Sequence, residues 1–95
     1  MVRTARIVLP GFAHHITQRG NDKQVVFHDD EDRHRYLAQL AHYSEKYGMR
    51  VLAYCLMSNH IHIVGIPQRK STLAKAIGQT HFQYTLHYQR KYHHS

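Results

Sequence analysis

Cysteine is nearly absent from this sequence, which limits both its redox chemistry and its metal chemistry. Cys55 is the single cysteine among 95 residues, so no disulfide can form within the chain and no cysteine-rich zinc site is possible. It lies in an apolar run with no neighbouring base, which is typical of a packed small side chain rather than a nucleophile. This usage fits the reducing environment of the cytoplasm.

Long apolar stretches are also missing. No run reaches the length of about eighteen apolar residues that predicts a membrane-spanning helix. The first residues, MVRTARIVLPGF, are basic but contain no apolar run of signal-peptide length. We therefore expect a cytoplasmic protein that neither crosses a membrane nor is secreted.

Acidic residues are few, and this scarcity gives the chain a strong positive charge. Six Asp and Glu stand against thirteen Lys and Arg, for a formal net charge of +7 and a pI near 9.9. A charge this large on so short a chain favours a polyanionic partner, nucleic acid first, over a merely soluble basic protein. The length predicts one small domain over residues 1–95, and no linker, repeat or low-complexity tract interrupts it.

Residues 30–47 have the spacing of an amphipathic helix. Asp29 or Asp30 can cap its N-terminus, and Gly48 supplies a C-terminal stop. Apolar positions recur at helical spacing, as Tyr36, Leu37, Leu40, Tyr43 or Ser44, and Tyr47.

The remaining segments predict three strands and a second helix. AHHITQRGN carries a short strand that ends at the Gly20-Asn21 turn, and KQVVFHDD leads from that turn to the first helix. MRVLAYCLMS and HIHIV form a hairpin around Ser58-Asn59. In the second helix, capped by Ser71, an apolar stripe contains Leu73, Ile77, Tyr84 and Tyr88 and is widened by Phe82 and Leu86.

The predicted element order is strand, helix, strand, strand, helix, which is an α+β, ferredoxin-like pattern without its last strand. In that topology the third strand is central, both helices cover one face of the sheet, and the other face stays open. We expect the domain to be incomplete at its C-terminus. The first strand would then be an exposed edge, and we expect it to pair with a second chain in a homodimer.

His60 and His62 stand two residues apart on the predicted central strand, so they share one face with backbones ~6.6 Å apart. One divalent metal ion could bridge the two imidazoles. Two solvated histidines on a half-buried strand are an equally good interpretation of the spacing alone. If Ile16 is buried, His15, Thr17 and Arg19 lie on the same open face as the histidine pair.

Two blocks of the sequence together resemble a known family. HHITQRGN near the start and AYCLMSNHIHIV in the middle are similar to motifs of the REP-associated tyrosine transposases, a branch of the single-tyrosine HUH transposases. The similarity continues through FHDDEDRHRYLAQLAHYSEKYGM and AIGQTHFQYTLHYQRKYHHS, so it covers almost the whole chain.

This resemblance implies a metal-dependent domain that nicks and rejoins single-stranded or hairpin DNA. His60 and His62 match the family's metal pair, which holds Mg²⁺ or Mn²⁺, and a tyrosine hydroxyl attacks a backbone phosphate to form a phosphotyrosine. The family's nucleophilic tyrosine, in a Tyr-x-x-x-Asn or Tyr-x-x-x-Gln pattern, has no counterpart here. Tyr84 and Tyr88 lie on the apolar stripe and are predicted to pack in the core, so the catalytic residue stays unknown.

Four residues around the first strand and turn are candidate DNA contacts. Arg19, Asn21 and Lys23 could bind phosphates, and His15 could donate a hydrogen bond or serve as a third metal ligand. Ordinary polar surface residues are the alternative for each of them. Arg90 and Lys91 near the end of the second helix are predicted to be plain surface charges.

Two other classes of function compete with a transposase. The first is a noncatalytic nucleic-acid-binding module on the same fold, although such sheets usually present stacking aromatic residues where this one offers histidines and Arg19. The second is a histidine-rich metal-binding protein. The eleven histidines show no regular repeat, which argues against that second class.

Overall fold

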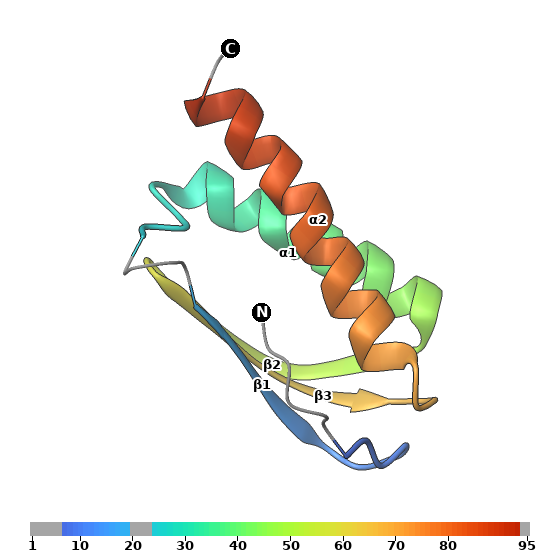
Figure 1. The fold of residues 1–95 in the computed structure, drawn as a ribbon. Helices are drawn as coiled ribbons and strands as arrows, with labels where there is room; N and C mark the ends of the chain where they lie inside the picture. Colours follow the sequence, from blue (N-terminus) through green and yellow to red (C-terminus); the bar gives the residue numbers. More distant parts are fainter. Residues whose placement is uncertain (1–6, 20–23, 94–95) are drawn as a thin grey trace.

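A computed structural model describes residues 7–19 and 24–93 of the chain. Its elements, in chain order, are β1 (His14–Arg19), α1 (Asp30–Tyr47), β2 (Met49–Met57), β3 (His60–Pro67) and α2 (Thr72–Tyr92). The two helices lie on one side of the sheet and leave its other side uncovered (Figure 1). We call that uncovered side the open face.

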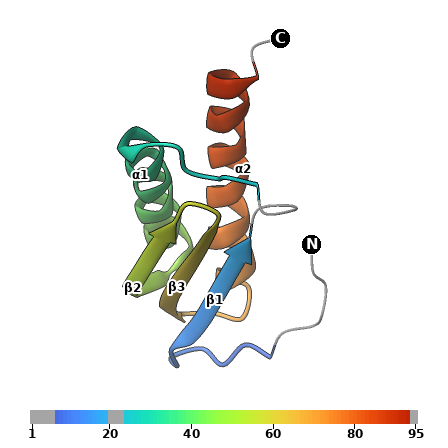
Figure 2. The same ribbon diagram turned by 90° about the vertical axis from the view of Figure 1, so that its left-hand side faces the viewer.

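The strands form one antiparallel sheet in the order β1-β3-β2. Figure 2 shows β3 between its two neighbours. This is the predicted α+β arrangement with the third strand central, consistent with a ferredoxin-like fold that has three strands in the part of the chain described. No helix among the described residues is long and apolar enough to span a membrane.

Local signals fix both ends of α1 where the sequence predicted them. The side chain of Asp29 accepts a hydrogen bond from the backbone N–H of Asp32 at 3.0 Å, which satisfies one of the free donors of the first turn. At the other end Gly48 has φ 82°, a left-handed conformation that glycine adopts without strain, and its N–H donates to the carbonyl of Ser44. Of the two alternatives for the buried stripe, Ser44 is buried and Tyr43 is only half-buried.

The start of α2 lies at the predicted position, but the predicted capping hydrogen bond is absent. Ser71 occupies the N-cap position, but its side chain makes no capping hydrogen bond. The hydroxyl of Thr72 instead accepts from the N–H of Arg69 and donates to the carbonyl of Tyr47, so it ties the helix to the end of α1. The predicted widening of the stripe is also wrong at Phe82, which is 56% exposed because it lies about 200° around the helix from the buried Thr80 and Tyr84.

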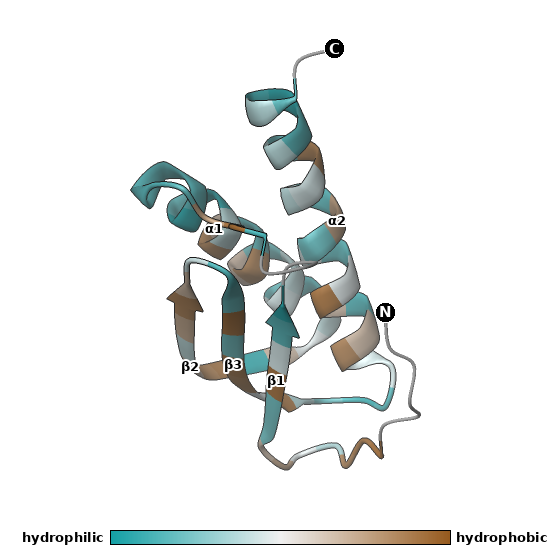
Figure 3. Ribbon diagram, turned by 60° about the vertical axis from the view of Figure 1, so that its left-hand side comes forward, coloured by the Kyte–Doolittle hydropathy of each residue, from teal (hydrophilic) through white to brown (hydrophobic). Residues whose placement is uncertain are grey.

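The core lies between the sheet and the helices. Ile61 and Ile63 of β3 point into it, and Ile16 is the buried apolar residue of β1, which is otherwise polar (Figure 3). Phe27, which sequence patterns did not place in the core, is buried there between Tyr36 and Tyr84. Its segment is held to the β2–β3 turn because Ser58 accepts backbone hydrogen bonds from Val26 and Phe27.

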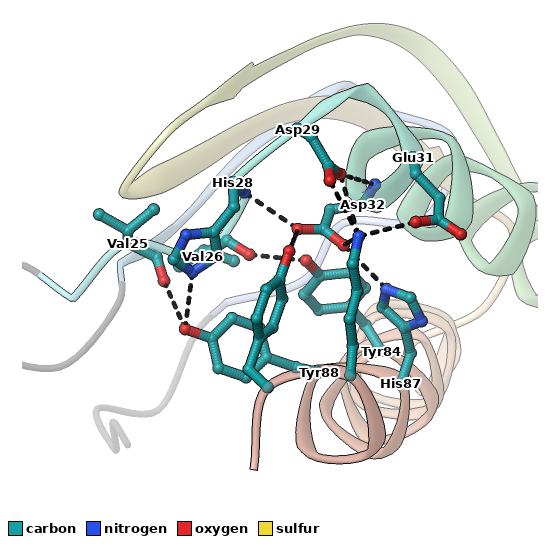
Figure 4. A network of polar contacts seen from close by, with 11 residues as sticks. Val25, Val26, His28, Asp29, Glu31, Asp32, Tyr84, His87 and Tyr88 are labelled. Atoms are coloured by element: carbon teal, nitrogen blue, oxygen red, sulfur yellow. Dashed lines mark hydrogen bonds and ion pairs between the residues drawn. The ribbon is translucent and has the colours of Figure 1, made fainter. Parts of the chain in front are cut away.

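A buried carboxylate joins the N-terminal turn of α1 to the C-terminal turns of α2 (Figure 4). Asp32 is fully buried, and its Oδ2 accepts hydrogen bonds from the His28 backbone N–H at 3.0 Å and the Tyr92 hydroxyl at 2.6 Å. Its Oδ1 lies 2.9 Å from His87 Nε2 and 3.0 Å from Lys91 Nζ. We call these five residues the Asp32 network.

The network changes the ionisation of its carboxylate. Burial by itself raises the pKa of Asp32, but the hydrogen bonds from Tyr92, His87, the His28 N–H and Lys91 outweigh burial and hold that pKa well below its usual range. Lys91 also contacts the carboxylates of Asp29 and Glu31. The prediction of a plain surface charge is therefore wrong for Lys91, because α2 places its ammonium over the acidic first turn of α1.

Candidate metal and nucleic-acid site on the open face

The strand register brings the predicted site residues of β1 and β3 together on the open face. Ile16 is 7% exposed, so its neighbours along β1 point the other way. In the register Arg19 pairs with His60 and Thr17 pairs with His62. Both histidines are half-buried and alternate with buried isoleucines. The shared face predicted from the spacing is therefore present.

The His60 ring is oriented by the residue before it. Asn59 Oδ1 lies 2.8 Å from His60 Nδ1, and since that oxygen can only accept, the ring nitrogen donates. A neutral imidazole with its proton on Nδ1 presents a lone pair on Nε2. Nε2 is the atom through which such a histidine binds a metal, and an oriented second nitrogen is the usual arrangement at metal sites. The role of Asn59 was missed because the sequence suggested only a hairpin turn.

His62 is held from the neighbouring strand. Its Nδ1 lies 3.1 Å from His15 Nε2 and 3.4 Å from Thr17 Oγ1. The rings of His15 and His62 are stacked, with centroids 5.2 Å apart. His15 therefore supports the ring of His62 from β1.

The two imidazoles of the pair are close enough to share one ion. Their ring centroids are 4.9 Å apart and their planes are inclined by 78°. Both rings use Nδ1 for contacts within the protein, and within the described residues no hydrogen bond involves Nε2 of His60 or His62. The donor set therefore fits a divalent ion as a two-histidine site.

The described segments contain no group of three or more histidine, cysteine or carboxylate side chains arranged to hold a metal. An ion bound by the histidine pair would need further ligands from water or from a phosphate. A two-histidine site leaves coordination positions open, which is the arrangement of catalytic rather than purely structural metal sites.

β2 contributes a cysteine, a methionine and an arginine to the same face. Cys55 pairs with His62 and Met57 with His60, while Arg50 pairs with Ile66 near the other end of β3. Cys55 is exposed, so the prediction of a packed cysteine is wrong. The apolar run that suggested burial belongs to an edge strand, and Cys55 points to the open face.

Six of the seven tyrosines lie on the two helices, and the seventh, Tyr54 of β2, pairs with the core-facing Ile63 rather than with a histidine. Tyr84 is buried, and its hydroxyl donates to the carbonyl of Val26 at 2.6 Å. The Tyr88 hydroxyl donates to the carbonyl of Val25 at 3.1 Å. Burial raises the pKa of Tyr84, and the nearby Asp32 carboxylate adds to that increase, so its hydroxyl is a poorer nucleophile than an exposed one. Both tyrosines lie on the helix side of the sheet, away from the histidines; the predicted core packing is confirmed for Tyr84, whereas Tyr88 is half-buried.

The remaining candidate DNA contacts divide into two groups. Arg19 is exposed at the end of β1, next to His60 in the register. Asn21 and Lys23 lie outside the described residues.

The fold and this face define a two-layer α+β domain whose solvent-facing strand surface carries a histidine pair and basic residues. The chain belongs to the IS200-like transposase family: the family model described as Transposase IS200 like matches residues 10–95. Comparison with curated proteins and with solved structures gave no significant match. Membership implies transposase activity in general and DNA as a partner, and the family generally uses a divalent metal ion.

Proposed function

We propose that this chain binds single-stranded or hairpin DNA on the open face and holds Mg²⁺ or Mn²⁺ through Nε2 of His60 and His62. The DNA would be nicked and rejoined in the cytoplasm through a phosphotyrosine intermediate. One observation carries the proposal: two neighbouring imidazoles on the solvent-facing side of the central strand have their Nδ1 atoms engaged by protein groups.

The surrounding residues orient the pair and attract the DNA backbone. Asn59 fixes the His60 ring, and His15 with Thr17 supports the His62 ring. Arg19, which pairs with His60 in the strand register, would contact a phosphate. A bound divalent ion would offset negative charge at the phosphate under attack. The residues of this chain would thus position and neutralise the phosphate.

The nucleophile must come from elsewhere under this proposal. Since no tyrosine faces the histidine pair, the attacking hydroxyl would be supplied by a tyrosine outside residues 1–95, on a continuation of the domain or on a second chain. The outer edge of β1, opposite its pairing with β3, is where we expect a second copy to pair.

The same observation about the tyrosines favours a second candidate, a noncatalytic nucleic-acid-binding module on this fold. The two candidates differ in whether strand cleavage can occur once a tyrosine is available. The 95-residue chain alone should form no covalent adduct with a hairpin oligonucleotide in Mn²⁺. An adduct that maps to Tyr84 would contradict the assignment of that residue to the core.

Metal binding is tested directly by titrating Mn²⁺ and following the proton relaxation of water. His60→Ala and His62→Ala should each abolish the binding seen for the unchanged chain. His42→Ala, which removes an exposed histidine from α1, is the matched control and should change nothing. Binding should weaken as the pH falls, because protons compete with the ion for the imidazole lone pairs. Equal affinity in all three variants would refute the metal site.

DNA binding is tested by its dependence on salt. The affinity for a single-stranded oligonucleotide should fall steeply as salt rises, because bound Lys and Arg release counterions from the phosphates. Fluorescence anisotropy at several salt concentrations measures this slope. A flat response would refute single-stranded DNA as the partner.

A further inference from the structure

The open face is chemically divided along its length, with polar residues on one outer strand and apolar residues on the other. Directly paired residues of an antiparallel sheet share a face, so the register arranges side chains in rows that cross the three strands. From β1 through β3 to β2, the rows around the histidine pair are Arg19–His60–Met57, Thr17–His62–Cys55 and His15–Val64–Ala53. Each row begins with a polar side chain on β1 and ends with an uncharged, mainly apolar one on β2.

The β2 ends of these rows are exposed. Met57 is 44% exposed, and Cys55 and Ala53 are exposed as well. We call these three residues the β2 strip. Figure 3 shows the contrast in hydropathy between β2 and the largely hydrophilic β1. Methionine adapts its shape to different partners and makes favourable contacts with aromatic rings, so the strip suits flat, unsaturated groups such as nucleobases.

The distribution of charge decides which way a single strand would lie on this face. In the three rows the formal positive charge belongs to Arg19 on β1, and the imidazoles lie on β1 and β3. Arg50 of β2 pairs with Ile66, beyond these rows and toward the far end of β3. Phosphates bind cationic and hydrogen-bonding side chains, whereas unpaired bases bind apolar and aromatic surfaces. The β1 side of the rows therefore suits the backbone of the strand, and the β2 side suits its bases.

The division repeats along the strands. Neighbouring strands lie ~4.8 Å apart, so β1 and β2 are separated by ~10 Å across the face. Because all three rows have the same polarity, a strand of DNA that runs along β3 meets polar groups on one side and the β2 strip on the other at every step. The histidine pair lies between the two.

We propose that the single strand runs along β3 with its phosphates on the β1 side and its unpaired bases packed against Met57, Cys55 and Ala53. The inference rests on the proposed function, because it takes the ligand to be the same DNA strand. Bases inside a duplex are paired and stacked, so an unpaired strand fits the strip and a duplex does not. The strip has no strong hydrogen-bonding group for base edges, so its contacts should tolerate any base.

Cys55 serves as a probe of this arrangement, because it is the single cysteine of the chain and is exposed. Its rate of alkylation by N-ethylmaleimide is measured without DNA, with a single-stranded oligonucleotide, and with an all-abasic strand of equal length. With the intact strand at about ten times its dissociation constant, alkylation should slow by about tenfold. The abasic strand, bound through its phosphates alone, should protect Cys55 much less. Equal protection by both strands would place the backbone over β2 and overturn the proposal.

Met57→Ala separates contacts to bases from contacts to the backbone. This variant should bind the intact oligonucleotide about three- to tenfold more weakly, through the loss of apolar contact with a base, and should bind the abasic strand as the unchanged chain does. Arg19→Ala should weaken the binding of both strands by the same factor. Phe82→Ala, at an exposed apolar residue of α2, is the matched control for Met57→Ala and should change neither affinity.

The outcomes distinguish this arrangement from the proposed function. Salt-dependent binding of both strands, with a Met57→Ala effect that is absent or equal for the two, would overturn the arrangement and leave the proposed function intact. Absence of any salt-dependent binding would overturn both. Alkylation of Cys55 that slows with rising protein concentration in the absence of DNA would show that a second copy covers the strip, which would also overturn the arrangement.

Discussion

Replacement of Asp32 by asparagine should destabilise the domain by about 3 kcal/mol. The amide keeps the size of the carboxylate but has only one oxygen. If its nitrogen replaces Oδ1 it faces the ammonium of Lys91, and if it replaces Oδ2 it faces the backbone N–H of His28. Either orientation takes the acceptor away from two donors, His87 and Lys91 or the His28 N–H and Tyr92, and both remove the charge that Lys91 and His87 contact. A domain of this size has a total stability of about 5–14 kcal/mol, so the loss is a large part of it.

The effect is measured by thermal unfolding at neutral pH, followed by circular dichroism. A loss of about 3 kcal/mol lowers the melting temperature by roughly 12–24 °C in a domain of this length. Asp30→Asn is the matched control, since it removes an equal charge from the same helical turn at an exposed side chain. Asp30→Asn should lower the free energy of unfolding by less than about 1 kcal/mol. A similarly small loss for Asp32→Asn would refute the view that this carboxylate holds the helices together.

The low pKa of Asp32 makes a second measurement possible on the same variant. The pKa is lower in the folded chain than in the unfolded chain, where the ordinary value is 3.8. The stabilisation is therefore complete at neutral pH and is lost as the pH falls below about 4. The unchanged chain should lose stability steeply on acidification, and Asp32→Asn should show a shallower decline. Parallel acid profiles would contradict the proposed charge on Asp32.

Three further changes have definite expected outcomes. Burial lowers the pKa of His81 to about 4, so the domain should lose about 3 kcal/mol as the pH falls from 6.5 to 4, and His81→Gln should lose less in unfolding curves over that range. Arg19→Ala should reduce the salt dependence of single-stranded DNA binding by about 0.7 in the logarithmic slope, and an unchanged slope would remove this contact. Gly65→Ala should destabilise the fold by about 1–3 kcal/mol in chemical denaturation, because its new Cβ would lie 3.0 Å from Met49 Sδ; a neutral result would mean that Met49 repacks freely.

Most of the fold could be predicted because its signals are local. The ends of α1 follow from Asp29 and Gly48, and the strand character of β3 follows from alternating isoleucines. The errors concern residues whose environment depends on distant parts of the chain. Lys91 is such a case, because it is a surface charge until α1 is placed beneath it. Phe82 is different: it stands two residues from both Thr80 and Tyr84, about 200° around the helix, so helical spacing alone places it away from the buried stripe.

The sequence predicts which candidate site residues share a face of the sheet, because alternate residues of a strand point to the same side. The spacing of His60 and His62 gives their common face, and one buried residue, Ile16, fixes the face of β1. The contact between His15 and His62 could not be obtained this way, because it depends on the register between strands 47 positions apart in the sequence.

The strand order also sets the sequence in which this surface can be assembled. β2 and β3 are joined by a two-residue turn and can pair early, whereas β1 reaches β3 only after the intervening helix and hairpin have been brought into place. Because the closure of such a long loop is slow, β1 should be among the last elements to dock during folding. The imidazole support from His15 and the charge of Arg19 would then reach the histidine pair in the final step, so the proposed DNA-binding surface would form after the hairpin that carries the pair.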